Sequence, residues 1–323
     1  MINFVQLNHK RDKDMIKLKE LVIIISSMVI MSAQMNGQNV GIGTNVFTPD
    51  TSALVEMRGT KGLLIPRMTT TERDAITSPA QSLLIFNTTT KCFETYIDGQ
   101  WRSIYCDPCS GVSTVSYDGV TYNTVSIGNQ CWFKENLRTT KYNDGTSISN
   151  VTNSSTWTST TSGAYCCYDN NTSNCDTYGA LYNWYAVETG KLCPSGWHVP
   201  SDAEWYTLTN YLSANSQYWC GSNSSYIAKS LASTTLWNTH TGTCTVGNDL
   251  SANNSTGFSA LPGGYRRYTD GSFYNLSYNG YWWSSTEYDG SDARLHYLYY
   301  NNAHVRRNDV DKRYGFSVRC LRD

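Results

Sequence analysis

The clearest pattern of apolar and polar positions in this chain follows a turn rich in proline and glycine. Trp205, Leu208 and Leu212 recur at intervals of three and four residues, which predicts a helix with one apolar face. Ser201 occupies the position of a helix N-cap, and Glu204 follows it three residues later. This spacing predicts a capping box, in which each residue satisfies a backbone N–H of the other. We therefore expect a well-defined helix start at the centre of a domain.

Elsewhere the apolar positions predict mainly short strands joined by turns. Two further helices are expected, at residues 178–187 and 224–232. Residues 143–176 are rich in Ser, Thr and Asn without a period, which predicts a loop. After Gly257 the pattern returns to short strands and turns. Strands, two or three helices, loops and strands again, in this order, predict an α+β fold with short antiparallel strands and not a parallel α/β fold.

Residues 39–107 predict a small β-rich unit. An Asp-Gly pair, a favoured two-residue hairpin turn, separates the apolar segments 92–97 and 100–105. A short helix is expected at residues 69–76. The unit holds too few apolar residues to bury a large core alone. We therefore expect it to pack on a neighbour or to form a homotrimer.

The chain is expected to divide into four parts. These are an N-terminal extension with a signal peptide at 1–38, a β-rich attachment or display module at 39–107, a linker at 108–114 and an α+β domain at 115–323.

The N-terminal part carries a 13-residue, mostly apolar run at residues 21–33, preceded by Lys17 and Lys19. A membrane span needs about 20 residues, so this run is too short to cross a bilayer. It fits a secretory signal peptide over about residues 15–33, with Met15 as a more usual start than Met1. The alternative, a buried helix, lacks an amphipathic pattern. We expect a secreted or cell-surface protein without a transmembrane segment in the mature chain.

Composition agrees with an extracellular protein. The 323 residues carry a net charge of −1, so nothing indicates a surface for nucleic acid or another polyanion. Only 16% of the residues are charged, while 24 are Tyr, 24 are Gly and 10 are Trp. This composition favours a β-rich protein whose polar surface comes from Ser, Thr, Asn and Tyr.

The eleven cysteines indicate disulfides formed in an oxidising compartment. Because the number is odd, at least one is free or pairs between chains. Cys220 and Cys244 flank a polar insertion and could close it as a loop. Cys106 and Cys109, separated by two residues, resemble a redox motif, but no βαβ pattern surrounds them. We interpret this pair as a structural link rather than a thiol oxidoreductase site.

Six sequence blocks resemble the Fibrobacter succinogenes major paralogous domain. They lie, in the order of that family, at residues 128–137, 178–186, 193–205, 257–266, 281–287 and 315–320. The family is similar in fold to formylglycine-generating enzymes and, more distantly, to C-type lectins. The resemblance implies a compact α+β domain whose last strand returns beside its first.

The N-terminal unit carries a second resemblance. Residues 39–44, 60–76, 82–88 and 92–101 resemble modules of surface and phage-tail-fibre-like proteins of Bacteroidetes. This resemblance implies display or attachment, and no chemistry.

The family resemblance also suggests how the cysteines pair. Cys193 and Cys320 both lie within the blocks that carry the resemblance, and we expect them to form a disulfide. Cys131 is expected to pair with Cys166 or Cys167.

The motifs of the related folds are missing from the sequence. Formylglycine-generating enzymes need reactive cysteines in the part that here spans residues 280–286, and no Cys lies there. Calcium-dependent lectins use a Glu/Gln-Pro-Asn/Asp tripeptide and a Trp-Asn-Asp, and this sequence has neither. We expect no cofactor, although a structural calcium held by other carboxylates and carbonyls stays open, because such sites have weak sequence signals.

Hydrolase and phosphate-binding motifs are also missing. The remaining catalytic candidate is His198, with Asp202 or Glu204 as its carboxylate partner. The plainer interpretation is a packed turn histidine next to two acidic residues that favour a helix N-terminus.

The most informative surface feature is the stretch 265–316, which holds ten of the 24 tyrosines. Tyr provides large contact area at low entropic cost and Asn provides adaptable hydrogen bonds, a mixture that binding loops use. The alternative is an ordinary polar β-surface. The candidate ligand-binding residues are Tyr288, Asp292, Arg294, His296, Tyr297, Tyr299, Asn301, Asn302, His304, Arg306 and Asn308.

These observations favour a secreted or surface-displayed, non-catalytic binding or adhesion protein whose ligand is a glycan or a surface protein. One alternative is an extracellular enzyme acting on polysaccharide through His198. Another is a structural component of a surface layer or fibre.

Overall fold

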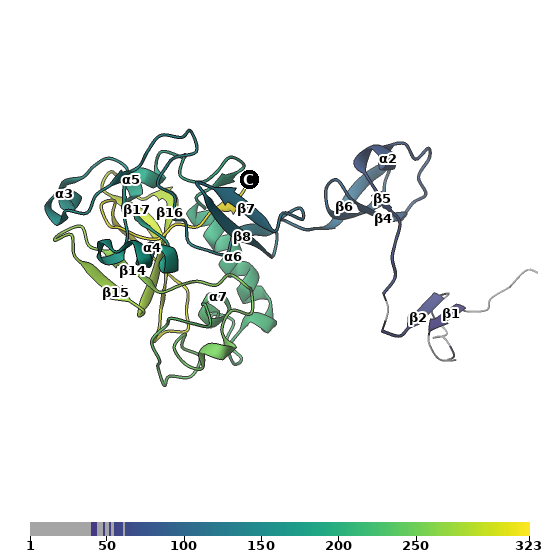
Figure 1. Ribbon diagram of the computed structural model, residues 1–323. Coiled ribbons are helices and arrows are strands. Elements are labelled where there is room, and N and C mark those ends of the chain that lie inside the picture. Colours follow the sequence, from purple (N-terminus) through teal and green to yellow (C-terminus); the bar gives the residue numbers. More distant parts are fainter. Residues whose placement is uncertain (1–39, 44–47, 49–51, 53–54, 61) are drawn as a thin grey trace, which may run out of the picture. The chain divides into compact units, whose positions relative to one another are not determined.

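The computed structural model describes residues 40–43, 48, 52, 55–60 and 62–323 (Figure 1). Two compact units divide the chain after Leu64, a point inside the expected 39–107 module. The other expected boundaries stay predictions. The expected signal peptide at about residues 15–33 lies outside the described residues. Within the described part of the chain, no helix has the length and apolar character needed to cross a membrane.

In the first unit, β1 (Val40–Gly43) pairs in parallel with β2 (Val55–Arg58). The second unit begins with a four-stranded sheet and a single helical turn, α2 (Thr70–Asp74). The strands follow the order β3 (Arg67–Met68), β4 (Leu84–Asn87), β5 (Cys92–Ile97) and β6 (Gln100–Cys106). Asp98 and Gly99 turn with φ of 53° and 77°, so the expected two-residue hairpin is confirmed. Thr69 and Glu72 form a capping box at the expected short helix.

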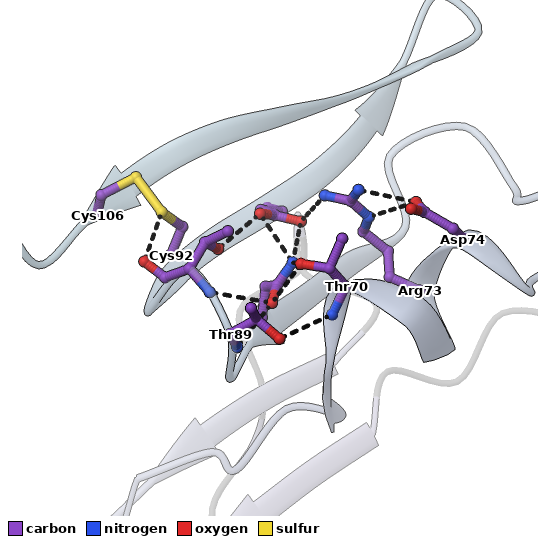
Figure 2. A network of polar contacts seen from close by, with 9 residues as sticks. Thr70, Arg73, Asp74, Thr89, Cys92 and Cys106 are labelled. Atoms are coloured by element: carbon purple, nitrogen blue, oxygen red, sulfur yellow. Dashed lines mark hydrogen bonds and ion pairs between the residues drawn. A yellow bond between two sulfur atoms is a disulfide. The ribbon is translucent and has the colours of Figure 1, made fainter. Parts of the chain in front are cut away.

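A buried polar network fastens α2 to this sheet (Figure 2). The side chain of Glu94 is 3% exposed and accepts a hydrogen bond from Arg73 Nη1 at 2.7 Å. Asn87 Nδ2 and Thr90 Oγ1 donate to the same carboxylate at 3.1 and 2.9 Å. Arg73 also contacts the exposed carboxylate of Asp74. A buried charge is tolerated here because each carboxylate oxygen has a donor.

The network makes the stability of this unit depend on pH. Burial raises the pKa of Glu94, but the hydrogen bonds from Arg73, Asn87 and Thr90 outweigh burial and lower the pKa below its ordinary 4.5. The folded unit therefore binds fewer protons than the unfolded chain in the acid range. Its stabilisation is full above about pH 4.5 and is lost as pH falls through the lowered pKa.

We expect Glu94→Gln to reduce the local free energy of unfolding at pH 7 by about 2 kcal/mol, because the charge-assisted bond to Arg73 is lost. Hydrogen exchange of peptides covering residues 84–106 would measure the loss. Asp74→Asn is the matched control, since that carboxylate contacts the same arginine from an exposed position. Equal effects of the two substitutions would contradict the special role of the buried carboxylate.

The larger part of the second unit, from residue 114 onward, contains two five-stranded sheets and one three-stranded sheet. The first has the order β13 (Trp197–His198), β19 (Leu321–Arg322), β9 (Gln130–Phe133), β8 (Val120–Ile127) and β7 (Thr114–Tyr117). The second has the order β15 (Phe273–Leu276), β14 (Gly263–Arg266), β16 (Asn279–Glu287), β17 (Asp292–Tyr299) and β18 (Arg306–Asp311). The third joins β10 (Ser149–Asn150), β11 (Ala164–Cys166) and β12 (Leu181–Tyr182). Most pairs are antiparallel, but β14 with β16 and β10 with β11 are parallel. The α+β class is confirmed.

The main helix, α6 (Asp202–Ala214), begins where the sequence predicts (Figure 1). Ser201 and Glu204 form the expected capping box. Trp205, Leu208 and Leu212 are buried along one face. Together with Trp132 and Trp282 they belong to one hydrophobic core. The apolar positions of the predicted helix are therefore the ones that the fold buries.

The other helices of this part are short. They are α3 (Ser154–Ser159), α4 (Thr172–Tyr178), α5 (Trp184–Val187) and α7 (Ala228–Leu231). The described residues form more helices than the two or three that the sequence predicts. The stretch 143–176, which the sequence predicts as loop, contains α3 and the start of α4. Asn153 and Asn171 cap them with side-chain oxygens, so the Asn-rich composition reflects helix starts as well as turns.

The continuous helix expected at residues 178–187 is wrong. Gly179 ends α4 with φ of +84°, and a Cβ at this position would lie 2.5 Å from the Cβ of Asn136. The chain then forms β12 before Asn183 caps α5. The left-handed glycine and the close approach of Asn136 divide an apparently helical pattern into three elements.

The terminal segment, residues 315–321, crosses the core and leads into the last regular strand of the chain. Gly315, Phe316 and Ser317 make isolated bridges to three different partners, namely Arg266, Tyr182 and Trp282. The regular strand is β19, which lies between β9 and β13 rather than beside β7. Residues 315–321 are all buried, so both faces of this segment pack against the protein.

Five disulfides link the described cysteines. They are Cys92–Cys106, Cys109–Cys131, Cys167–Cys175, Cys193–Cys320 and Cys220–Cys244. The last two are the pairs that the sequence suggests. Cys193–Cys320 closes the longest loop, with a sequence separation of 127 residues, and so gives the largest entropic stabilisation in the chain-entropy model.

One expected link is wrong. Cys131 bonds Cys109, and not Cys166 or Cys167. Cys106 bonds Cys92, which lies directly opposite it in the β5–β6 ladder, so Cys106 and Cys109 belong to two separate disulfides. Cys166 is the free thiol of the described cysteines. It lies in a core cluster on β11, where burial raises its pKa to about 12.

Candidate functional site

The sheet β15-β14-β16-β17-β18 carries a hollow of about 160 Å³. We call it the tyrosine hollow. Its lining residues are Tyr265, Tyr281, Leu295, Tyr297, Tyr299, Asn308, Val310, Tyr314 and Phe316. None of these side chains carries a charge at neutral pH. Burial raises the pKa of four of the tyrosines, Tyr265, Tyr281, Tyr297 and Tyr314, and so keeps their hydroxyls protonated.

Strand register explains why these tyrosines meet. Tyr281 lies directly opposite Tyr297, and Asn279 lies opposite Tyr299 in the β16–β17 ladder. Directly opposed residues in an antiparallel pair share one face, and that face recurs at every second residue. Leu295, Tyr297 and Tyr299 of β17 therefore point to the same side.

The floor of the tyrosine hollow is held by aromatic packing. The rings of Tyr281 and Phe316 stack at 5.2 Å with an interplanar angle of 20°, and Tyr314 stacks on Phe316 at 5.3 Å. Tyr281 and Phe316 are buried, and Asn279 Nδ2 donates to the Tyr281 hydroxyl at 2.9 Å. A floor fixed in this way is present before any ligand binds.

Four half-buried tyrosines surround this floor. They are Tyr265, Tyr297, Tyr299 and Tyr314. Tyr297 and Tyr299 contact each other with ring centroids 4.9 Å apart, and Tyr265 contacts Tyr281 edge-on at 5.2 Å. Each of these side chains combines an aromatic surface with a hydroxyl.

The other face of β17 carries ion pairs. Arg294 Nη1 donates to Asp309 at 2.6 Å and its guanidinium lies 4.1 Å above the ring of Tyr288. His296 is 4% exposed and stacks on Trp205 of α6 with centroids 5.0 Å apart. Its Nε2 lies 3.0 Å from Asp202 Oδ1.

Asp202 links the start of α6 to β17 and β18. It receives hydrogen bonds from His296 and from Arg307 Nε at 2.7 Å. The bond from His296, followed by that from Arg307, holds the pKa of Asp202 well below its usual range. Burial lowers the pKa of His296. These contacts fasten the helix to the sheet.

The sequence-based candidates therefore lie in three places. Tyr297, Tyr299 and Asn308 line the tyrosine hollow. Tyr288, Asp292, Arg294 and His296 lie outside it. In the turn after β17, the Asn302 side chain accepts from the backbone N–H of His304, and Asn301 is exposed. Arg306, the first residue of β18, is also exposed. Whether each residue contacts a ligand stays a prediction.

The candidate list omits Tyr265, Tyr281 and Tyr314, although all three lie within the Tyr-rich stretch 265–316. The period-two alternation along β16 and β17 could have identified Tyr281, because it separates the two faces of each strand. Tyr314 lies outside the regular strands, and only the folded chain brings it to the hollow.

The catalytic alternative involves a histidine whose two ring nitrogens are both occupied. His198 Nδ1 lies 2.6 Å from Asp323 Oδ1, and Nε2 lies 2.9 Å from Glu204 Oε1. Glu204 also belongs to the capping box of α6. Asp202 contacts His296 and Arg307 instead of His198. Of the two carboxylates expected as partners of His198, the fold brings only Glu204 into contact with it. Both ring nitrogens already face a carboxylate, so neither is free to take a proton from a substrate.

Another feature could hold a ligand. A depression of about 400 Å³ near α4 is lined in part by Arg138 and Asp176, but these charges pair with each other at 3.0 Å. Across the residues that the structure describes, no three His, Cys, Asp or Glu side chains gather closely enough to hold a metal ion.

Comparison with known families gives two matches. The model of the Fibrobacter succinogenes major domain matches residues 125–322. The model of a phage tail like trimerisation region matches residues 41–124. No curated protein and no solved structure matches the chain. Both expected resemblances are thus confirmed.

The carboxylates around His198 predict a measurable dependence of stability on pH. Burial lowers the pKa of His198, but the hydrogen bonds to Asp323 and Glu204 outweigh burial and raise it above its ordinary 6.5. The stabilisation is therefore full below about pH 6.5 and is lost as pH rises through the raised pKa. We expect His198→Gln to cost less than about 1 kcal/mol at pH 6, since the pair is partly exposed, and still less at pH 9.

Urea unfolding at the two pH values would measure this difference. Asp323→Asn is a useful comparison, because it removes one of the two carboxylates and should reproduce part of the same pH dependence. An equal loss of stability at pH 6 and pH 9 in His198→Gln would show that the charge of the imidazolium contributes nothing.

Proposed function

The chain belongs to the Fibrobacter succinogenes major domain family, and on this basis we propose that it is a secreted or cell-surface protein that binds a glycan or a surface protein and performs no catalysis. The observation that carries the proposal is the tyrosine hollow, a preformed concave site with aromatic surfaces, hydroxyls and an amide. Such a site recognises a ligand but offers no activated nucleophile or base.

Several observations support the location. The family assignment indicates a surface-associated protein. Five disulfides suit an oxidising compartment. The apolar run at residues 21–33 suits a secretory signal peptide.

We extend the proposal to the fold of the large domain, which we take to be similar to C-type lectins and formylglycine-generating enzymes. In support, β19 at the end of the chain lies in the same sheet as β7 at the start of the domain. The Cys193–Cys320 disulfide fastens this return.

We expect the full chain to bind members of a glycan array or a cell-surface protein array. Tyr297→Ala with Tyr299→Ala should weaken that binding by at least about tenfold, because truncation of a central tyrosine removes a large contact area. Tyr206→Ala is the matched control, as it removes an exposed tyrosine of α6 far along the chain from the hollow residues. Absence of binding on both arrays would contradict the proposal.

We also propose that the N-terminal part assembles the chain into a homotrimer. The match to a phage tail like trimerisation region supports this. In the sheet β3–β6, the polar network under α2 covers one face, whereas Phe93 and Tyr105 lie opposite each other on the other face. Phe93 is 40% exposed and Tyr105 is 58% exposed. Two further copies of the chain would cover this apolar face, and a trimer would raise the avidity of three binding sites.

We expect the full chain to have the mass of three protomers in light scattering coupled to size-exclusion chromatography. Phe93→Glu with Tyr105→Glu should shift the mass toward one protomer, because a charge in an apolar interface is costly. Thr71→Glu, on the exposed surface of α2, should leave the trimer intact. A monomeric full chain would contradict this assembly, and a regular filament would favour a structural fibre component.

A further inference from the structure

We infer that the tyrosine hollow binds one uncharged sugar ring of a glycan, by ring stacking and hydroxyl hydrogen bonds, without calcium. The inference rests on the proposed binding function and assigns its site and ligand class. Three properties of the hollow carry it: its size, the chemistry of its lining and its lack of carboxylates.

The size suits a single six-membered ring. The hollow measures about 160 Å³. A cavity of about 150 Å³ in another protein accepts a benzene-sized ligand, so a similar volume holds one ring and not a long segment of chain. The hollow is open on one side, since four of its tyrosines are only half-buried. The remaining rings of an oligosaccharide can therefore continue into solvent.

The lining combines two chemical properties that a pyranose also combines. One face of the sugar ring presents C–H groups, which pack on aromatic surfaces such as Tyr297 and Tyr299. The rim of the sugar presents hydroxyls, which both donate and accept hydrogen bonds. Tyrosine hydroxyls have the same dual capacity, and Asn308 adds an amide with a donor and an acceptor. A purely apolar ligand would cover polar groups of the lining without offering them a hydrogen bond.

The charge of the lining favours an uncharged ligand. A carboxylate buried in the hollow would lose its water without gaining a cation, because every lining residue is neutral. A candidate cation is Arg306, which lies opposite Tyr297 in the β17–β18 ladder but is exposed and does not line the hollow. A uronic acid could therefore pair with Arg306 only at the rim, where ion pairs contribute little.

Calcium has no ligands at this site. The lining contains no Asp or Glu, and the acidic residue Asp309 on β18 pairs with Arg294 on the opposite face of the sheet. Calcium needs six to eight oxygen ligands, usually with carboxylates among them. Sugar binding at the hollow must therefore come from the tyrosines and Asn308 themselves.

The test uses the full chain with pairs of soluble oligosaccharides that differ only in a neutral hexose or the matching hexuronic acid at the terminal ring. Binding is measured by calorimetry and by saturation-transfer NMR, with and without a calcium chelator. We expect neutral members to bind at least about tenfold more tightly than acidic ones, with no effect of the chelator. We expect Tyr297→Ala to weaken binding about tenfold or more, and Tyr206→Ala to leave it unchanged.

Tyr299→Phe keeps the ring and removes only the hydroxyl, so it tests hydrogen bonding without risk to the packing of the sheet. We expect it to weaken binding several-fold. Near-UV circular dichroism of Tyr297→Ala verifies that the fold is retained.

The outcomes separate the two proposals. Tighter binding of acidic members, weakened by Arg306→Gln, would overturn the uncharged ligand class. Loss of binding with the chelator would overturn the calcium-free mechanism. Binding on the arrays that is insensitive to Tyr297→Ala and Tyr299→Phe, or confined to proteins, would overturn the assignment of the hollow but leave the binding function standing. Only the absence of binding, on both arrays and to every oligosaccharide tested, would contradict both the binding function and the assignment of the hollow.

Discussion

The guanidinium of Arg319 lies where the two five-stranded sheets of the large domain are joined. It is completely buried and has no carboxylate among its hydrogen-bond partners. Its Nε donates to Asn136 Oδ1 at 3.0 Å, and its other nitrogens donate to backbone carbonyls of Phe133, Phe258 and Ser259. Burial lowers its pKa to about 9, so the group still carries its charge at neutral pH. The domain tolerates this buried cation because oxygens from four residues surround it.

This contact organises the core through Asn136. The same Asn136 Oδ1 accepts from Trp282 Nε1 of β16 at 2.8 Å, while its Nδ2 donates to the carbonyl of Tyr178 at the end of α4. One amide thus connects the terminal segment to the second sheet and to a helix. Arg319 lies next to Cys320, whose disulfide to Cys193 fixes the segment covalently. The terminal residues are therefore a central element of the fold.

The tyrosine hollow depends on the same segment. Its floor residue Phe316 lies three residues before Arg319 and stacks on Tyr281. The opposite face of the sheet is occupied by the ion pairs of Asp202, His296 and Arg307, which attach α6. Because one face of β17 is used for structure, the binding role that we propose falls to the other face. The sheet separates the two roles by the alternation of side chains along a strand.

The sequence by itself determined the features that depend on neighbouring residues. Capping boxes at Ser201 and Thr69 and the Asp-Gly hairpin at the end of β5 need only a few residues in the right order. The α+β class and the domain family also follow from local blocks. The resemblance to the family also predicted one long-range contact, the disulfide Cys193–Cys320.

Only the tertiary structure decided the features that depend on distant partners. Asn136 splits the apparently helical stretch at Gly179, and the β5–β6 ladder places Cys106 opposite Cys92, while Cys109 bonds Cys131. Tyrosines from β14, β16, β17 and the terminal segment meet in one hollow because of strand register. Spacing along a chain records which face a residue shares with its neighbours. It does not record which distant strand lies beside that face, since this depends on the packing of the whole domain.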